Sequence, residues 1–342
     1  MRITLEQSAI MPAAAIAAEV TSAGSGFASA VWMDSDGETL TMFATDAEVT
    51  AQATVPVAGT PGAVAVNARG LAKILRGLSG TVTLTADEHG LTVAAGGSRS
   101  RLNRLADDAP PAPDVGEDTP VDAATIAAAL SVGYCASQDD SRPAITGIHI
   151  RGPHATATDG HRLARVTAAA DLGVTGILHR RGAQILRGLL TGAETVAVAS
   201  SRTASRWTVG RTQLWVRQID AAFPDADKVI PPQGAAWPLP VDDLIAAVRR
   251  VTAMFGGRDN VLRLTLGDDV IALDMAAPDV GDAHEVVDAP GAAGGRIGVN
   301  HKYLLEALAH LGGEVTWQSG DTIGPLVLRS AQALAVLMPM RL

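Results

Sequence analysis

The sequence predicts an α+β protein made of three repeats of one domain, each with two helices and an antiparallel sheet. The main observation is internal similarity, because Arg69–Leu78 and Arg181–Leu190 both begin with Arg-Gly and continue into Ile-Leu-Arg-Gly-Leu. A segment that begins at Val299 has the same plan, with a helical pattern, a glycine stop and an alternating strand. The 342 residues therefore contain three copies of a unit of roughly 115 residues.

The repeat also sets the expected domain boundaries. We place the three domains at residues 1–118, 119–237 and 238–342, and the third copy of the repeat is the most diverged. Arg2–Leu5 is expected to form a strand ahead of the first helix. Each domain then opens with a helical segment, and these segments are Leu5–Glu19, Asp122–Tyr134 and Val241–Phe255.

The second helix of the first two repeats is predicted to have one apolar face and one basic face. In the first repeat, Leu71, Ile74 and Leu75 belong to a single apolar stripe. The other face carries only basic charge, and the basic residues of the two repeats are Arg69, Lys73, Arg76, Arg180, Arg181 and Arg187. In the third repeat the basic residues are Arg249, Arg250 and Lys302, and acidic neighbours offset them. These faces are either ordinary solvated surfaces or surfaces that meet an anion. The net charge of −9 favours the second, because an acidic protein here keeps acid-free basic helices.

Composition excludes several classes of protein. No stretch approaches eighteen continuous apolar residues, so we expect no membrane span and no membrane partner. The single cysteine, Cys135, rules out an intrachain disulfide framework and suits a reducing cytoplasm. The sequence lacks a phosphate-binding Gly-x-x-x-x-Gly-Lys-[Ser/Thr] loop and histidines at metal-ligand spacing, so no cofactor or metal is expected. With 3% aromatic residues, single-strand base stacking is not expected either.

A polar stretch at Ala157–Arg165 stands out in the middle of the chain. It follows an alternating run that predicts strand structure, and Asp159-Gly160 predicts a tight turn. This turn is either a solvated hairpin tip or a site. Asp159 and His161 could form an acid–base pair, but their neighbouring positions and the lack of a nucleophile argue against it. We therefore expect that the protein is not an enzyme and has no catalytic residues.

Four motifs together resemble a known family. They are Ala-Thr-Asp-Gly-His-Arg-Leu-Ala at 157–164, Val-Leu-Met-Pro-Met-Arg-Leu at 336–342, Ser-Arg-Pro-Ala-Ile-Thr-Gly-Ile at 141–148 and Phe-Pro-Asp at 223–225. The sequence resembles the bacterial DNA polymerase III β subunit, the β sliding clamp, over nearly its whole length. The resemblance implies a DNA-clamp fold in which two chains of three domains form a homodimeric ring of six domains around duplex DNA. Such a ring is a processivity factor in DNA replication. It would act in the cytoplasm, associated with the nucleoid.

The resemblance also implies partners and site residues. The partners would be duplex DNA held without sequence preference, the DNA polymerase III α subunit, the clamp-loader complex, other polymerases, and mismatch-repair or ligase-type proteins with short Gln/Leu/Phe-type motifs. The basic residues above would face DNA. The peptide groove would comprise Ile145, Thr158, Gly160, His161, Arg162, Leu163, Pro224, Lys228, Val229, Val336, Met338, Pro339, Met340, Arg341 and Leu342. At the dimer interface, Arg99, Arg101 and Leu102 would meet Met254 and Phe255, with Asp279, Asp282 or Glu285 as ionic partners.

The first domain departs from the family pattern. The helix expected at Leu5–Glu19 carries two glutamates and no basic residue, which weakens the case for DNA contact there. Two alternatives therefore stand beside the replicative clamp. One is a paralogous clamp for repair, a mobile element or inhibitor resistance, and the other is an interaction scaffold that keeps the groove without encircling DNA.

Overall fold

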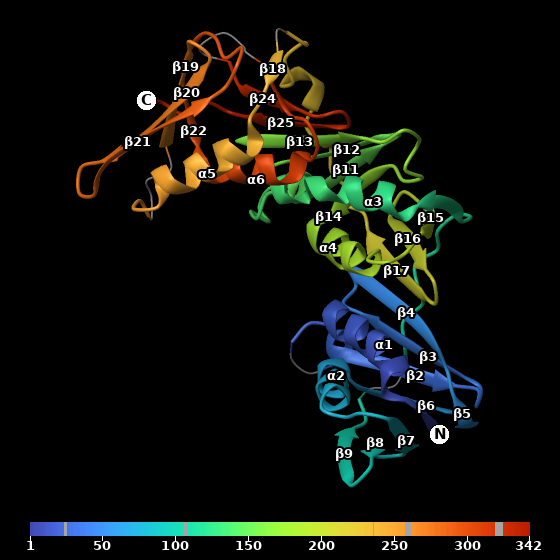
Figure 1. The fold of residues 1–342 in the computed structure, drawn as a ribbon. Coiled ribbons are helices and arrows are strands. Elements are labelled where there is room, and N and C mark those ends of the chain that lie inside the picture. Colours follow the sequence, from blue (N-terminus) through green and yellow to red (C-terminus); the bar gives the residue numbers. More distant parts are fainter. Residues whose placement is uncertain (24–25, 106–107, 235, 257–260, 319–323) are drawn as a thin grey trace. The chain divides into compact units, whose positions relative to one another are not determined.

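The computed structural model describes residues 1–23, 26–105, 108–234, 236–256, 261–318 and 324–342. The chain forms two compact units (Figure 1). Unit 1 contains residues 1–127 and 173–220, and unit 2 contains residues 128–172 and 221–342. Both are α+β with antiparallel sheets, as the sequence predicts. No helix among the described residues is long and apolar enough to cross a membrane.

Unit 1 consists of two antiparallel sheets with helices packed against them. Its helices are α1 (Gln7–Val20), α2 (Ala68–Arg76) and α4 (Arg180–Leu189). Its strands are β1 (Arg2–Glu6), β2 (Ala30–Ser35), β3 (Thr39–Thr45), β4 (Val49–Pro56), β5 (Ala58–Thr60), β6 (Gly62–Asn67), β7 (Thr81–Asp87), β8 (Gly90–Ala95), β9 (Ser98–Asn103), β10 (Thr119–Asp122), β14 (Gly176–His179), β15 (Thr195–Ser200), β16 (Ala204–Val209) and β17 (Thr212–Arg217). One sheet has the order β5-β1-β7-β8-β9, and the other has the order β10-β15-β16-β17-β4-β3-β2-β6.

The helix α2 illustrates why the predicted amphipathic segments fold as helices. The side chain of Asn67 accepts a hydrogen bond from the Gly70 amide and caps the first turn. Leu71 and Leu75 are fully buried in the core of unit 1. The helix α2 itself lies beside α1 (Figure 1). Lys73 and Arg76 lie in the last turn, where positive charge is favoured by the helix dipole.

Unit 2 contains the remaining sheets and the helices α5 (Val241–Thr252) and α6 (His301–Leu311), which lie side by side (Figure 1). Short 3₁₀ turns are η2 (Ser131–Cys135), η3 (Pro143–Ile145) and η4 (Ala226–Lys228). The strands are β11 (Gly147–Arg151), β12 (His154–Thr158), β13 (Arg162–Thr167), β18 (Ala236–Pro238), β19 (Val261–Gly267), β20 (Val270–Ala277), β21 (Gly281–Asp288), β22 (Gly295–Asn300), β23 (Thr316–Gln318), β24 (Leu326–Arg329) and β25 (Ala333–Leu337). One sheet runs β11-β12-β13-β25-β24-β23-β18, and another runs β21-β20-β19-β22.

Each unit joins strands from two neighbouring sequence repeats. In unit 1, β4 pairs with β17, with Ala51 opposite Leu214. In unit 2, β13 pairs with β25, with Leu163 opposite Val336. The sheets therefore continue across the expected domain boundaries, and the division into three domains remains a prediction about the chain.

The predicted opening helices are present with shifted ends. α1 begins at Gln7 because Leu5 still pairs with Val82 inside β1 and β7. The middle helix, α3 (Ala123–Leu130), runs across the division between the units and continues into η2. Asp122 closes β10, and its carboxylate accepts hydrogen bonds from the amide and hydroxyl of Thr125. These bonds cap the helix start, so Asp122 lies just outside it.

Candidate functional site

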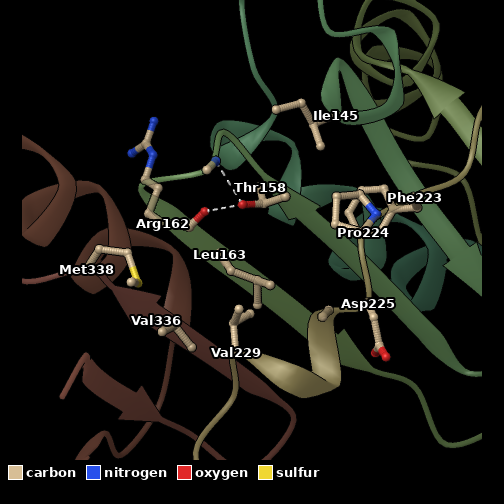
Figure 2. A pocket seen from close by; sticks show the side chains of 12 residues that line it. Ile145, Thr158, Arg162, Leu163, Phe223, Pro224, Asp225, Val229, Val336 and Met338 are labelled. Carbon is tan, nitrogen blue, oxygen red and sulfur yellow. Dashed lines mark hydrogen bonds between the residues drawn. The ribbon is translucent and has the colours of Figure 1, made fainter.

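The Asp-Gly turn connects β12 to β13 and is held by its own side chains. The hydroxyl of Thr158 accepts a hydrogen bond from the Gly160 amide and donates one to the carbonyl of Arg162 (Figure 2). The carboxylate of Asp159 accepts from the amides of His161 and Arg162. Gly160 has φ +93°, a conformation that favours glycine. The turn is thus a rigid support for the residues that flank it.

Arg162 connects this turn to other elements of unit 2. Its side chain is only 9% exposed and forms a salt bridge to Asp159, with Nε 3.0 Å from Oδ2. It also pairs with Glu306 of α6 and donates to the carbonyl of Tyr134 at 2.8 Å. Its guanidinium lies 4.2 Å from the ring centre of Tyr303, within cation–π distance. One buried cation therefore ties the turn to η2 and α6.

The protonation states of this cluster follow from burial and charge. Burial is the largest single effect and disfavours the charge of Arg162, but the hydrogen bond to Glu306 and the nearby negative charges together outweigh it, so the pKa of Arg162 lies above its usual value. Burial raises the pKa of Tyr134 above its usual range and raises the pKa of the Cys135 thiol to about 12. At neutral pH the cluster thus contains a charged arginine beside a neutral phenol and a neutral thiol. Since the thiolate is the reactive form, Cys135 is a packing residue here.

An apolar pocket of about 190 Å³ lies against the turn (Figure 2). The buried side chains of Leu163 and Val336, from the paired strands β13 and β25, form its floor. Val229 and Met338 lie at its mouth and are 46% and 44% exposed. A pocket lined by apolar side chains with a few polar groups is typical of a site that takes apolar side chains of a ligand.

The structure brings together many of the residues expected in the groove. The predicted residues that line the pocket are Ile145, Thr158, Gly160, Arg162, Leu163, Pro224, Val229, Val336 and Met338. The predicted residues that do not line it are His161, Lys228, Pro339, Met340, Arg341 and Leu342. The prediction missed Phe223, Asp225 and Ala226, which also line the pocket. The Phe-Pro-Asp motif was the available signal, because two of the missed residues belong to it.

Two backbone hydrogen bonds hold the last residues of the chain, one to the turn and one to β22. The amide of Met338 donates to the carbonyl of His161 in the turn, at 2.9 Å. The amide of Met340 donates to the carbonyl of Gly298, which follows Ile297 in β22, at 2.8 Å. A Cβ atom at Gly298 would lie 2.7 Å from the Met340 carbonyl oxygen, so only glycine allows this approach. Residues 338–342, the tail, therefore do not all lie at the pocket: Met338 lines it, whereas Met340 is bonded to β22 of another sheet.

Asp159 and His161 do not share a side-chain contact. The Asp159 carboxylate is used by backbone amides and by Arg162. The His161 side chain is exposed. Among the residues that the structure describes, no cluster of three His, Cys, Asp or Glu side chains could hold a metal ion. The contacts of Asp159 and His161 therefore indicate that the turn has a structural role beside the pocket and is not an acid–base pair.

The basic helix residues have different environments. Arg181 pairs with Asp46 and donates to the carbonyls of Glu19 and Val20. Arg250 forms a salt bridge with Glu285, with Nε 2.8 Å from Oε1. Arg69 is exposed but donates to the Thr21 carbonyl, and Arg180 is partly buried. The remaining predicted residues are exposed at their helix surfaces, and these are Lys73, Arg76, Arg187, Arg249 and Lys302.

The residues expected at a dimer interface lie on or near two sheet edges. Arg99, Arg101 and Leu102 belong to β9, the last strand of its sheet. Arg101 pairs with Asp87, and Leu102 packs against the core of unit 1. In unit 2, Met254 is 53% exposed, whereas Phe255 is buried in the core. Two of the expected ionic partners, Asp282 and Glu285, lie on the edge strand β21, and the third, Asp279, lies just before it.

Models of known families match both ends of the chain. The model described as DNA polymerase III beta subunit, N-terminal domain, matches residues 1–113. The model described as DNA polymerase III beta subunit, C-terminal domain, matches residues 228–341. The second match includes part of the pocket and the whole of β25.

The chain is also similar to individual proteins and solved structures that are described as sliding clamps. The beta sliding clamp of Synechocystis sp. is 27% identical over 292 residues, which are 75% of this chain and 74% of that protein. The beta sliding clamp of Staphylococcus aureus is 26% identical over 313 residues, 83% of each. A Caulobacter crescentus beta sliding clamp structure has a TM-score of 0.92 at 25% identity and covers 100% of this chain and 99% of that one. A Bartonella birtlesii sliding clamp bound to griselimycin has a TM-score of 0.92 at 26% identity and covers 100% of both chains.

Proposed function

Since this chain belongs to the DNA polymerase III beta subunit family, we propose that it is a processivity factor that encircles duplex DNA as a homodimeric ring. It holds polymerases and other replication or repair proteins on DNA through the apolar pocket. The single observation that carries the proposal is that pocket, in which the strand turn, the Phe-Pro-Asp segment and Met338 meet. No catalytic step is needed, because a ring acts by topology.

The pocket suits short peptide motifs that contain large apolar residues. Its floor is fixed by buried Leu163 and Val336, while flexible Met338 at the mouth can adjust to different partners. Thr158 lines the pocket, and its hydroxyl oxygen places a polar group beside the apolar surface. Affinities near micromolar, about −8 kcal/mol, allow partners to exchange. The proposed partners are the polymerase α subunit, the clamp loader, other polymerases, and mismatch-repair or ligase-type proteins.

Sequence-independent contact with DNA is proposed for the exposed basic residues of α2, α4, α5 and α6. Lys73, Arg76 and Arg187 are exposed and lie on acid-free helices. Contacts of this kind to phosphates are weak and depend on salt, which suits a ring that slides. Arg181 and Arg250 already have acidic partners, so we assign them a smaller part. A clamp with this role would work in the cytoplasm, associated with the nucleoid.

Dimerisation is proposed through the edge strands β9 and β21. Edge strands carry unpaired backbone groups that can continue a sheet into a second copy. β9 presents the exposed Arg99 and Arg101, and Asp282 and Glu285 lie on β21. Val286 of β21 is 51% exposed, which adds apolar area to that edge. Head-to-tail pairing of these edges would close a ring of two chains.

The alternative roles are a paralogous clamp or an interaction scaffold that does not encircle DNA. α1 has no basic residue in its last turn, and this observation favours weak DNA contact in the first repeat. One experiment separates the scaffold from a ring that encircles DNA. The protein is loaded with a clamp loader onto nicked circular DNA and its retention is compared with that on the same DNA after linearisation. A clamp stays on the circle and slides off the linear form. A stable monomer in sedimentation at micromolar concentration, together with no retention on circles, would refute the proposal.

A further inference from the structure

A second cleft, polar in character, adjoins the apolar pocket in unit 2. It has a volume of about 690 Å³. The two cavities share the segment from Phe223 to Ala226, which lines both. The other walls of the cleft are formed by the hairpin of β11 and β12 and by Arg165 of β13. The cleft is therefore a direct continuation of the apolar pocket.

Strand register shows that both cavities lie on one face of one sheet. Residues that are directly opposite in an antiparallel pair point to the same face, and positions two apart on a strand share that face. Thr158, Leu163 and Val336 form one such row across three strands, at the apolar pocket. The next row is His149, Thr156 and Arg165, in the cleft. Arg151 and His154 form the row after that.

Most charged side chains of the cleft are paired with one another, and the charge that is left for a ligand is positive. Arg165 pairs with Asp227 at 2.6 Å, and Asp225 pairs with Lys228 at 3.3 Å. Arg151 is exposed, and within the part of the chain that the structure describes it has no hydrogen bond or ion pair. Its charge helps to lower the pKa of Asp227, after the larger effect of Arg165. After these pairings one cation, Arg151, remains, in a protein whose net charge is −9.

Beside the arginines, the cleft has an aromatic wall. The rings of His149 and Phe223 stack with centroids 4.7 Å apart and planes at 12°. Burial lowers the pKa of His149, and the charges of Arg151 and Arg165 add to this effect, so the imidazole is neutral at neutral pH. A ligand in the cleft would thus meet a neutral aromatic surface next to guanidinium groups. Guanidinium groups favour carboxylates, which they can bind through two hydrogen bonds.

We propose that the cleft binds an acidic side chain next to the apolar motif of a docking peptide, with Arg151 as its ionic partner. This inference rests on the proposed peptide-binding function and extends the site beyond the apolar pocket. Rows two residues apart on a strand are separated by about 7 Å, and extended peptide advances about 3.3 Å per residue. The acidic residue would therefore lie roughly two to four residues from the peptide residue that fills the apolar pocket. The sequences of partner proteins can be searched for this spacing.

Peptide binding by fluorescence anisotropy tests this proposal with the full-length protein. The probe is a labelled peptide with a Gln/Leu/Phe-type motif, extended at either end by three Asp, three Ser or three Lys. At one end, the Asp extension is expected to bind about tenfold more tightly than the Ser extension. Arg151→Ala is expected to remove this gain, and Arg151→Glu to favour the Lys extension. Arg263→Ala is the matched control, because Arg263 is an exposed arginine of β19 in the same unit, away from the cleft.

The outcomes separate this inference from the proposed function. If no version of the peptide binds the unaltered protein, the peptide-binding function itself is wrong. If the motif binds and the Asp and Ser extensions bind equally, the pocket stands and the acidic subsite is refuted. A gain from Asp that survives in Arg151→Ala would refute it too. So would a result in which Arg151→Ala weakens retention on nicked DNA and leaves every peptide affinity unchanged.

Discussion

Arg162 and Glu306 form an ion pair although 144 residues separate them in the chain. Arg162 begins β13 directly after the turn, and Glu306 lies on α6. Unit 1 contains a related pair in which the roles are exchanged. There Asp46, which follows β3 at the equivalent turn, pairs with Arg181 of α4 across 135 residues. In both units a turn in one repeat is thus attached to a helix of the next repeat by opposite charges.

The first prediction concerns this attachment. Arg162→Met is expected to destabilise the protein by about 3 kcal/mol, because it leaves the carboxylate of Asp159 nearly buried without its cation. Glu306→Gln is expected to have a smaller effect, since the side chain of Glu306 is 48% exposed. Urea unfolding measures both. Arg217→Met is the control, because the pair of Arg217 and Glu48 is exposed and should matter little. Equal losses for Arg162→Met and Arg217→Met would contradict the assignment.

The second prediction concerns the tail. Deleting residues 338–342 is expected to abolish binding of polymerase peptides while the dimer persists, because Met338 lines the pocket and β25 ends at Leu337. Met338→Ala alone should weaken binding roughly fivefold to tenfold. Anisotropy titration measures the affinity, and sedimentation measures the dimer. Met254→Ala, also an exposed methionine, should leave peptide affinity unchanged. Full binding after the deletion would show that the pocket has been assigned wrongly.

The third prediction concerns the backbone of the turn. Gly160→Ala places a Cβ on a residue with φ +93° and is expected to cost about 1–2 kcal/mol. Gly188→Ala should instead stabilise the protein by about 0.5–1 kcal/mol, because Gly188 lies in α4 and an added Cβ meets no atom within 4 Å. Denaturant midpoints of the two variants should move in opposite directions. A midpoint for Gly160→Ala at or above that of the natural protein would mean that the turn carries no conformational strain on substitution.

The fourth prediction is a pH dependence from His149. Because burial lowers its pKa in the folded state, the unfolded chain binds the proton more readily. The stability due to the neutral, half-buried His149 is therefore complete above the unfolded pKa of about 6.5 and declines as the pH falls below it. Unfolding at pH 8 and pH 5.5 should show a larger loss for the natural protein than for His149→Phe. An identical loss in both proteins would exclude His149 as a source of the pH dependence.

The fifth prediction concerns DNA. The triple variant Lys73→Glu, Arg76→Glu and Arg187→Glu is expected to lose loading onto nicked circles at about 0.15 M salt, since phosphate contacts dominate the encounter with DNA before the ring is closed. Its unfolding midpoint and peptide affinity should not change, because all three side chains are exposed at helix surfaces. Arg181→Glu alone should lower stability, because it opposes Asp46. If the triple variant is loaded and retained normally, these three residues are not the surface that contacts DNA.

The sequence determined the repeated plan and most helix positions, because both depend on local patterns. The stripe of Leu71 and Leu75 predicted α2, and the repeat predicted α4 at nearly the same bounds. The turn could be predicted from Asp159-Gly160, because the hydrogen bonds that hold the turn join residues that are near neighbours in the chain. Motif resemblance supplied the groove residues, many of which line the pocket.

Only the tertiary structure decided which distant residues meet. The partner of Arg162 could not be predicted, because an ion pair across 144 residues depends on the packing of α6 against β25. Arg181 carries the same charge as Lys73 in the sequence, yet Asp46 neutralises it in the fold. The motif resemblance assigned Met338 and the residues after it to one groove. In the structure, the hydrogen bond from Met340 to Gly298 holds the later residues away from the pocket that Met338 lines. The cleft beside Arg151 also arises only in the folded chain, because strand register and the crossing segment from Phe223 bring its walls together.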